Sequence, residues 1–95
     1  MRLIHRERII DFMAERANSA PSLRAWAQHM EQSDFKHFGE LRKIFAAADY
    51  VRPYTIFNIA GNKYRLAMLI NYILRVVNIE NVMTHAEYDK GKWRN

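Results

Sequence analysis

The chain has 95 residues, 49% of them hydrophobic and 26% charged, which predicts one globular domain over residues 1–95 and excludes a disordered protein. It contains no cysteine, so disulfide scaffolds, thiolate zinc sites and cysteine nucleophiles are excluded. Fifteen lysines and arginines against ten aspartates and glutamates give a formal net charge of +5, which suits a polyanionic partner such as nucleic acid and equally serves solubility alone.

The basic excess lies in the second half of the chain. Residues 1–50 carry eight basic and seven acidic side chains, whereas residues 51–95 carry seven basic and three acidic ones. No apolar run approaches the roughly 20 residues of a membrane span, and the first residues lack the apolar core of a signal peptide. These features predict a cytoplasmic protein without a membrane partner.

The first half of the chain has helical periodicity after a short opening strand at residues 2–4. Apolar side chains recur at helical spacing over residues 5–17, and small and polar residues with a proline interrupt them at residues 18–22. A second helix follows, and a third, shorter one is expected within residues 39–48. The side chains expected to face the core are Leu23, Trp26, Ala27 and Met30 from the second helix, and Leu41, Ile44 and Phe45 from the third.

The second half changes to the period of β-strands after Pro53. Residues 54–60 and 63–72 flank Gly61-Asn62, which predicts a hairpin with a two-residue turn. Residues 75–83 are expected to add a third strand. The predicted fold class is therefore α+β, with N-terminal helices on one face of a small, mainly antiparallel sheet and a short C-terminal helix or tail.

The two-residue loop sets the register of this hairpin, with Ile59 opposite Tyr64 and Asn58 opposite Arg65. Side chains alternate between the two faces of a strand, and a turn centred on residues 73 and 74 extends both faces onto the third strand. The expected core face holds Phe57, Ile59, Tyr64, Leu66, Met68, Ile70, Val77 and Ile79, and the opposite, polar face holds Asn58, Lys63, Arg65, Asn78, Glu80 and Val82.

A polar motif, Thr84-His85-Ala86-Glu87-Tyr88-Asp89, follows the third strand. As local structure alone, its first and fourth residues form a capping box that opens a short helix. As chemistry, His85, Tyr88 and Asp89 stand at i, i+3 and i+4 and share one helix face, close to Arg65 on the sheet. A histidine and a tyrosine beside an arginine can transfer protons next to a phosphate. The spacing fits both interpretations.

Two blocks of this sequence together resemble the HigB family of bacterial toxins, which belongs to the RelE-like mRNA interferases. The first block is Phe57-Asn58-Ile59-Ala60-Gly61-Asn62-Lys63-Tyr64-Arg65-Leu66, and the second is the motif from Thr84 to Asp89. The length and the order of helices and hairpin also agree, so the resemblance covers essentially the whole chain.

The resemblance implies a RelE-like fold and an endoribonuclease, independent of metals and organic cofactors, that cuts translated mRNA in the ribosomal A site. It also implies a cognate HigA-type antitoxin with a helix-turn-helix fold. Operator DNA would then be bound only through the complex of the toxin with its antitoxin.

The resemblance also implies roles for individual residues, because in RelE-like cleavage the ribose 2′-OH attacks the neighbouring phosphorus. Arg65 would hold the phosphate, since its planar fork matches two phosphate oxygens, and Lys63 would add positive charge. His85 would be the general acid, because imidazole exchanges protons near neutral pH. Tyr88 would assist proton transfer or stack on a base, and Asp89 would orient His85 or Tyr88.

Glu80 departs from the family pattern, since many relatives carry a basic residue at this position. On the predicted register it shares the face of Arg65, where it would be the general base or would weaken phosphate binding by pairing with Arg65. If it is the base, Glu80→Gln abolishes cleavage. Three functions therefore remain open: a ribosome-dependent endoribonuclease, a non-catalytic RNA- or DNA-binding module, and an inactivated toxin that acts through its antitoxin complex.

The other polar residues are assigned to RNA contact or to solvent. For residues 90–95, disorder is the default expectation, with RNA contact or docking onto the fold as alternatives. The histidines other than His85 match no metal-ligand spacing, and no metal site is expected. Besides Lys63, the residues expected to contact RNA are Asn58, Asn62, Lys36, Lys43, Lys90 and Lys92.

Overall fold

The structure is a computed structural model that describes residues 1–94. Its strands are β1 (Arg2–Ile4), β2 (Asp49–Val51), β3 (Tyr54–Ile59), β4 (Tyr64–Asn71) and β5 (Val76–Thr84). Its helices are α1 (Arg6–Glu15), α2 (Ala20–Gln32), α3 (Phe38–Ile44) and α4 (His85–Lys90), with the short 3-10 helices η1 (Ala17–Ser19) and η2 (Lys92–Arg94).

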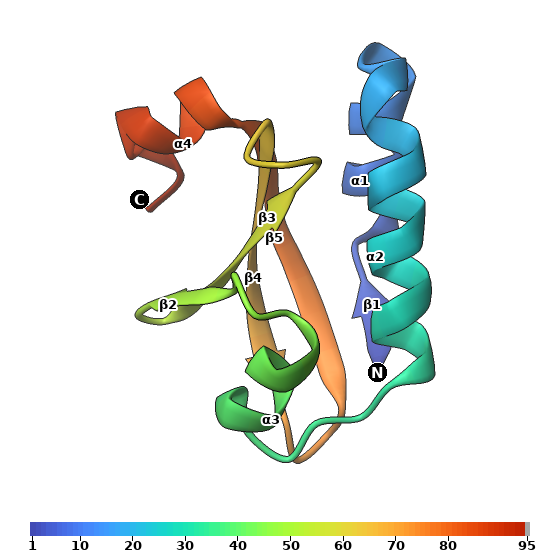
Figure 1. Ribbon diagram of the computed structural model, residues 1–95, viewed down its shortest axis with the longest axis vertical. Coiled ribbons are helices and arrows are strands. Elements are labelled where there is room, and N and C mark those ends of the chain that lie inside the picture. Colours follow the sequence, from blue (N-terminus) through green and yellow to red (C-terminus); the bar gives the residue numbers. More distant parts are fainter. Residues whose placement is uncertain (95) are drawn as a thin grey trace.

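The strands form one five-stranded sheet in the order β1-β5-β4-β3-β2. Strand β1 runs parallel to β5, and the other neighbours are antiparallel. Figure 1 shows α1 and α2 along one face of this sheet, whereas α4 and the C-terminal segment lie on the opposite side. The predicted α+β class, with N-terminal helices on one face, is therefore confirmed.

The predicted register of the β3–β4 hairpin is also confirmed. Ile59 pairs with Tyr64, and Asn58 pairs with Arg65. Gly61 has a φ of 58° and Asn62 a φ of 78°, so both adopt the positive φ that a primed two-residue turn requires. This turn joins the end of β3 to the start of β4 at the edge of the molecule where α4 begins.

Strand β2 was not predicted, since it has only three residues. It pairs with the start of β3, where Val51 lies opposite Tyr54. The turn between the two strands contains Pro53, which the sequence alone presents as the end of the helical region. The pairing of β1 with β5 makes the sheet mixed.

A β-bulge in β5 makes one part of the predicted register wrong. Ala67 pairs with Asn81 and Met68 with Ile79, so Glu80 is an extra residue without a partner on β4. The side chains of β5 after the bulge therefore exchange faces relative to the prediction. Val82 packs against the main core instead of lying on the face of Arg65, and Met83 lies on the Arg65 face instead.

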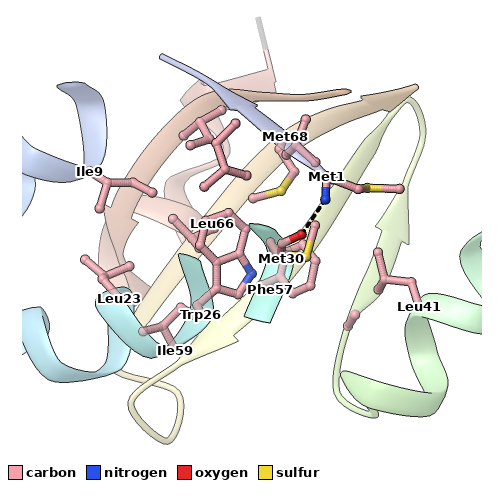
Figure 2. Packing of buried hydrophobic residues seen from close by; sticks show 14 of the residues in the cluster. Met1, Ile9, Leu23, Trp26, Met30, Leu41, Phe57, Ile59, Leu66 and Met68 are labelled. Atoms are coloured by element: carbon pink, nitrogen blue, oxygen red, sulfur yellow. Dashed lines mark hydrogen bonds between the residues drawn. The ribbon is translucent and has the colours of Figure 1, made fainter. Parts of the chain in front are cut away.

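The main core fills the space between the sheet and the helices α1 and α2 (Figure 2). The predicted residues Leu23, Trp26 and Met30 of α2 are all buried there. Figure 2 also shows the N-terminal amine of Met1, which donates a hydrogen bond of 2.7 Å to the carbonyl oxygen of Met30. This contact joins the first strand to the last turn of α2.

One predicted core residue, Ile44, lies outside. Its side chain is 57% exposed, whereas Leu41 on the same helix is fully buried. Helix α3 ends at Ile44, and the next residue, Phe45, turns back to pack edge-on against Phe57 with the ring centres 5.0 Å apart. The predictions for Leu41 and Phe45 are thus confirmed, and the one for Ile44 is wrong, because the helix ends there.

The central position of Leu66 on β4 makes it the side chain whose loss should destabilise the fold most directly. Leu66 is 0% exposed, so Leu66→Ala is expected to lower the free energy of unfolding by about 2–5 kcal/mol. Urea denaturation followed by circular dichroism measures this loss. Ile44→Ala is the control and should change the value by less than about 0.5 kcal/mol, because Ile44 is exposed. Equal losses in the two variants would contradict the packing described for β4.

The second face of the sheet carries a smaller apolar cluster. Ile56, Ala67 and Met83 form its floor, and Trp93 of η2 covers them at 7% exposure. The segment after α4 therefore docks onto the fold, which is one of the alternatives expected for this tail; Asn95 lies outside the described residues. Within residues 1–94, no helix is long and apolar enough to cross a membrane.

Candidate active site

Strand β5 and helix α4 meet beside the β3–β4 turn. The hydroxyl of Thr84 accepts a hydrogen bond of 3.2 Å from the backbone N–H of Glu87, and the Glu87 carboxylate accepts one of 2.8 Å from the N–H of Thr84. The predicted capping box is thus confirmed. The backbone N–H of Thr84 also holds the pKa of Glu87 below its usual value. The N–H of His85 donates to the carbonyl of Lys63 at 3.0 Å, which ties the start of α4 to the hairpin turn.

Arg65 is the buried charged side chain of the described residues, with 8% exposure. Its Nη1 donates to the carbonyl oxygens of Asn62 at 3.0 Å and Tyr64 at 3.2 Å. Its guanidinium carbon lies 5.4 Å from the centre of the Tyr88 ring. Two carbonyls and one aromatic ring therefore fix the orientation of the guanidinium, and among the described residues Nη2 and Nε donate no hydrogen bond.

Burying a cation is costly, so the burial of Arg65 raises the question of what compensates its charge. A buried charge is tolerated only when hydrogen bonds or an opposite charge compensate it. Arg65 has two carbonyl acceptors and no carboxylate partner within residues 1–94. Among the described residues, no carboxylate therefore neutralises this guanidinium, which suits an anionic ligand.

His85 and Asp89 form an exposed pair on α4. Nδ1 of His85 lies 2.9 Å from Oδ2 of Asp89, and the side chains are 46% and 60% exposed. The predicted i, i+4 proximity is therefore found. Because Nδ1 faces the carboxylate, Nε2 is the nitrogen that remains for a ligand. Tyr88, one position before Asp89, lies against Arg65 and so connects this pair to the sheet.

Most of the remaining predicted residues surround this group. Asn58 pairs with Arg65 across the hairpin, and the carbonyl of Asn62 accepts from its guanidinium. Lys63 is exposed in the turn. Lys90 ends α4 and Lys92 begins η2, and both line an open groove of about 400 Å³ next to Trp93.

Two predicted RNA-binding residues lie elsewhere. Lys43 belongs to α3 and Lys36 to the loop that precedes it, and both are exposed. Figure 1 shows α3 and α4 at opposite ends of the molecule's long axis. These two lysines therefore do not belong to the group around Arg65.

Glu80 does not lie on the face of Arg65, so that part of the prediction is wrong. Its carboxylate lies 3.2 Å from Nη1 of Arg8 on α1. The same Nη1 donates to the carbonyls of Ile79 at 2.8 Å and Glu80 at 3.0 Å, at the bulge. The extra residue turns Glu80 towards the edge and α1, away from the site.

Two aromatic residues of the site region, Trp93 and Tyr54, were not among the predicted site residues. The rings of Tyr88 and Trp93 are stacked, with centres 5.2 Å apart and planes 14° apart, and Trp93 packs edge-on against Tyr54 at 5.3 Å. The only signal in the sequence was a single tryptophan in a basic tail. Its docking depends on the apolar second face of the sheet, which the predicted register described as polar.

The arrangement combines an anion-binding cation with groups that carry protons. Arg65 can bind a phosphate through its free N–H groups, and His85 can give or take a proton at Nε2. Within residues 1–94, no three histidine or carboxylate side chains are grouped so that they could hold a metal ion. An arginine beside a histidine and a tyrosine suits acid–base transfer next to an anion.

Comparison with known proteins agrees with this arrangement. The sequence is similar to "mRNA interferase HigB" of Escherichia coli O6:H1, with 28% identity over 76 residues that cover 77% of this chain and 74% of the relative. It is also similar to "mRNA interferase HigB" of Shigella flexneri, with 27% identity over 92 residues that cover 94% of this chain and 88% of the relative.

Comparison with models of protein families identifies the family of this chain. The model of the HigB toxin family, described as the RelE-like toxic component of a toxin–antitoxin system, matches residues 19–91. This stretch contains the hairpin, the bulged strand β5 and all of α4. It therefore includes Arg65, His85, Tyr88 and Asp89. The chain belongs to the HigB family of RelE-like toxins.

Proposed function

We propose that this toxin is a ribosome-dependent endoribonuclease that cuts translated mRNA. The proposal rests on the contact of Arg65 with Tyr88 beside the exposed pair of His85 and Asp89. The relatives named as mRNA interferases supply the substrate class. A non-catalytic RNA-binding module needs cations at the phosphates but no proton donor, so the presence of both favours the enzyme.

The proposed reaction is an intramolecular attack within the RNA. The ribose 2′-OH attacks the adjacent phosphorus, the bond to the 5′ oxygen breaks, and a cyclic phosphate and a 5′-hydroxyl end result. Arg65 stabilises the extra negative charge on the phosphate through the N–H groups that Asn62 and Tyr64 do not engage. His85 protonates the leaving 5′ oxygen, and Asp89 orients its ring. Neither a metal ion nor an organic cofactor takes part.

The lysines around the site would bind the RNA on either side of the cut. Lys63, Lys90 and Lys92 are exposed near Arg65 and suit the phosphates of flanking nucleotides. Lys36 and Lys43 lie at the other end of the molecule and suit ribosomal RNA instead. Asn58 and Asn62, on the hairpin, are placed to contact the sugar or base nearest the cleaved bond.

Membership of a toxin–antitoxin family supports the partners we propose. A toxin–antitoxin system requires an antitoxin, and we assign a HigA-type protein with a helix-turn-helix fold to this role. Operator DNA would be bound only by the complex of the two proteins. Both the mRNA substrate and the ribosome place the activity in the cytoplasm.

Mapping RNA 5′ ends tests the proposed function. The toxin is induced in bacteria that translate a reporter mRNA, and 5′ ends are sequenced with and without an inhibitor of translation initiation. New ends inside the coding region that disappear with the inhibitor are the expected result. Ends that persist with the inhibitor would refute ribosome dependence. No new ends from soluble, folded protein would support the binding module or the inactivated toxin.

Substitution of Glu80 is expected to leave cleavage intact. Glu80→Gln removes a carboxylate that faces Arg8 on α1 and not the site, so the cleavage rate should stay within about threefold of wild type. The partly exposed ion pair contributes at most about 1 kcal/mol, so the protein stays folded. Single-turnover cleavage of a ribosome-bound mRNA measures the rate. Loss of cleavage with retained folding would restore Glu80 as the general base.

A further inference from the structure

Helix α4 carries four of the proposed site residues but has little to hold it in place. It has six residues, and none of them is buried. A helix this short is not stable in isolation, because nucleation is costly and each turn adds little. Its orientation must therefore come from contacts with the rest of the protein.

Trp93 provides one such contact. Its indole N–H donates a hydrogen bond of 3.0 Å to the carbonyl of Tyr88, and its ring lies parallel to the Tyr88 ring. The indole itself is anchored, since it covers Ile56, Ala67 and Met83 and packs edge-on against Tyr54. Trp93 thus connects α4 to three strands of the sheet.

The same tyrosine ring contacts Arg65. The guanidinium carbon of Arg65 lies 5.4 Å from the centre of the Tyr88 ring, and an aromatic face attracts a guanidinium. Trp93 therefore holds Tyr88 in place, and the Tyr88 ring in turn limits where the guanidinium of Arg65 can lie. A change at Trp93 reaches the phosphate-binding group through one intervening ring.

We propose that Trp93 is a positioning residue of this toxin: it fixes Tyr88, and through Tyr88 it fixes Arg65 in the orientation that binds the scissile phosphate. This inference rests on the proposed function and adds a residue to it. Trp93 belongs to η2 and is 7% exposed, because its ring lies against the sheet, so we assign its effect to Tyr88 and not to a bond with the reacting RNA. Its effect is on the geometry of the site, and misplacement by 1 Å can cost about 100-fold in rate.

A pair of substitutions separates positioning from general stability. Trp93→Phe and Trp93→Leu both lose the indole N–H and both keep an apolar side chain over the cluster, but only phenylalanine keeps a flat face for Tyr88. Positioning by stacking predicts that Trp93→Leu lowers kcat for cleavage of ribosome-bound mRNA by about tenfold or more. KM should change less than kcat, because the substitution removes none of the lysines and Lys63 lies in the hairpin turn, apart from Trp93. Trp93→Phe should stay within about threefold of wild type.

Met30→Ala controls for loss of stability. Met30 is fully buried in the main core on the other side of the sheet, so its truncation destabilises the fold without a contact to α4. At a temperature at which circular dichroism shows all variants to be folded, Met30→Ala should keep the wild-type kcat. If Trp93→Leu cleaves as fast as Trp93→Phe, or if Met30→Ala loses as much kcat as Trp93→Leu, the proposal is wrong.

A second measurement does not depend on cleavage. The ring of Tyr88 lies 5.4 Å from the Arg65 guanidinium carbon, so its ring current is expected to shift the NMR signals of the Arg65 side chain, which then report whether Tyr88 stays in place. They should move towards unstructured values in Trp93→Leu and remain near wild type in Trp93→Phe. Unchanged Arg65 signals in the leucine variant would overturn the positioning role even in a protein that does not cleave RNA. Wild-type protein that fails to cleave while Arg65 responds as expected would instead refute the proposed function alone.

Discussion

Replacing Arg65 by alanine is expected to reduce cleavage of ribosome-bound mRNA by about 100- to 1,000-fold, the usual effect of removing a group that stabilises charge in a transition state. Its guanidinium is fixed by the carbonyls of Asn62 and Tyr64, so little reorganisation is needed when the phosphate gains charge. The rate is measured by single-turnover cleavage with purified ribosomes. Circular dichroism checks the fold, because Arg65 is also buried.

Arg65→Lys is the matched variant, since it keeps the charge and loses the planar fork. It should recover part of the lost rate but remain well below wild type, because an ammonium cannot bind two phosphate oxygens and the two carbonyls together. A lysine variant with wild-type rate would show that only charge matters at this position. An alanine variant with wild-type rate would remove Arg65 from the mechanism.

The second large effect is expected at His85. His85→Gln keeps a polar side chain next to Asp89 but cannot transfer a proton, so cleavage should fall by about 100- to 10,000-fold if His85 is the general acid. Asp89→Asn should cost much less, about tenfold, because it changes only how the ring is oriented. Both side chains are exposed, so neither change should unfold the protein.

A substrate with a better leaving group tests directly whether His85 is the general acid. An RNA in which sulfur replaces the leaving 5′ oxygen does not need a proton at that atom. On this substrate, His85→Gln should approach the wild-type rate, whereas Arg65→Ala should stay slow. If the sulfur substrate does not rescue His85→Gln, the histidine has another role than general acid.

The hairpin and its faces were predictable because their signals are local. Gly61 and Asn62 determine the turn, the turn determines the register, and the register places Asn58 opposite Arg65. The capping box of α4 was equally readable, since it depends only on residues three apart. Both features bring Arg65 and the Thr84–Asp89 motif to the same end of the sheet.

The predictions that were wrong concern features that depend on distant parts of the chain. The bulge at Glu80 has no residue signature; it is accommodated because Arg8, more than 70 positions earlier, donates to the exposed carbonyls. The docking of Trp93 requires Met83 on the second face, and Met83 lies there only because of the bulge. The β-bulge, which the sequence did not reveal, thus led to the wrong predicted faces for Glu80 and Val82. It also hid the surface on which Trp93 docks.

The bulge has a consequence for how this protein tolerates changes in length. The extra residue in β5 determines on which face of the sheet each later side chain of the strand lies. Deletion of Glu80 would therefore move each later residue by one position and place its side chain on the other face. Met83 would then enter the main core, the floor under Trp93 would be lost, and α4 would start from the wrong side of the strand. The number of residues between Ile79 and Thr84 is therefore constrained more strongly than the chemical nature of residue 80. Position 80 should tolerate substitution, whereas the segment should not tolerate insertion or deletion.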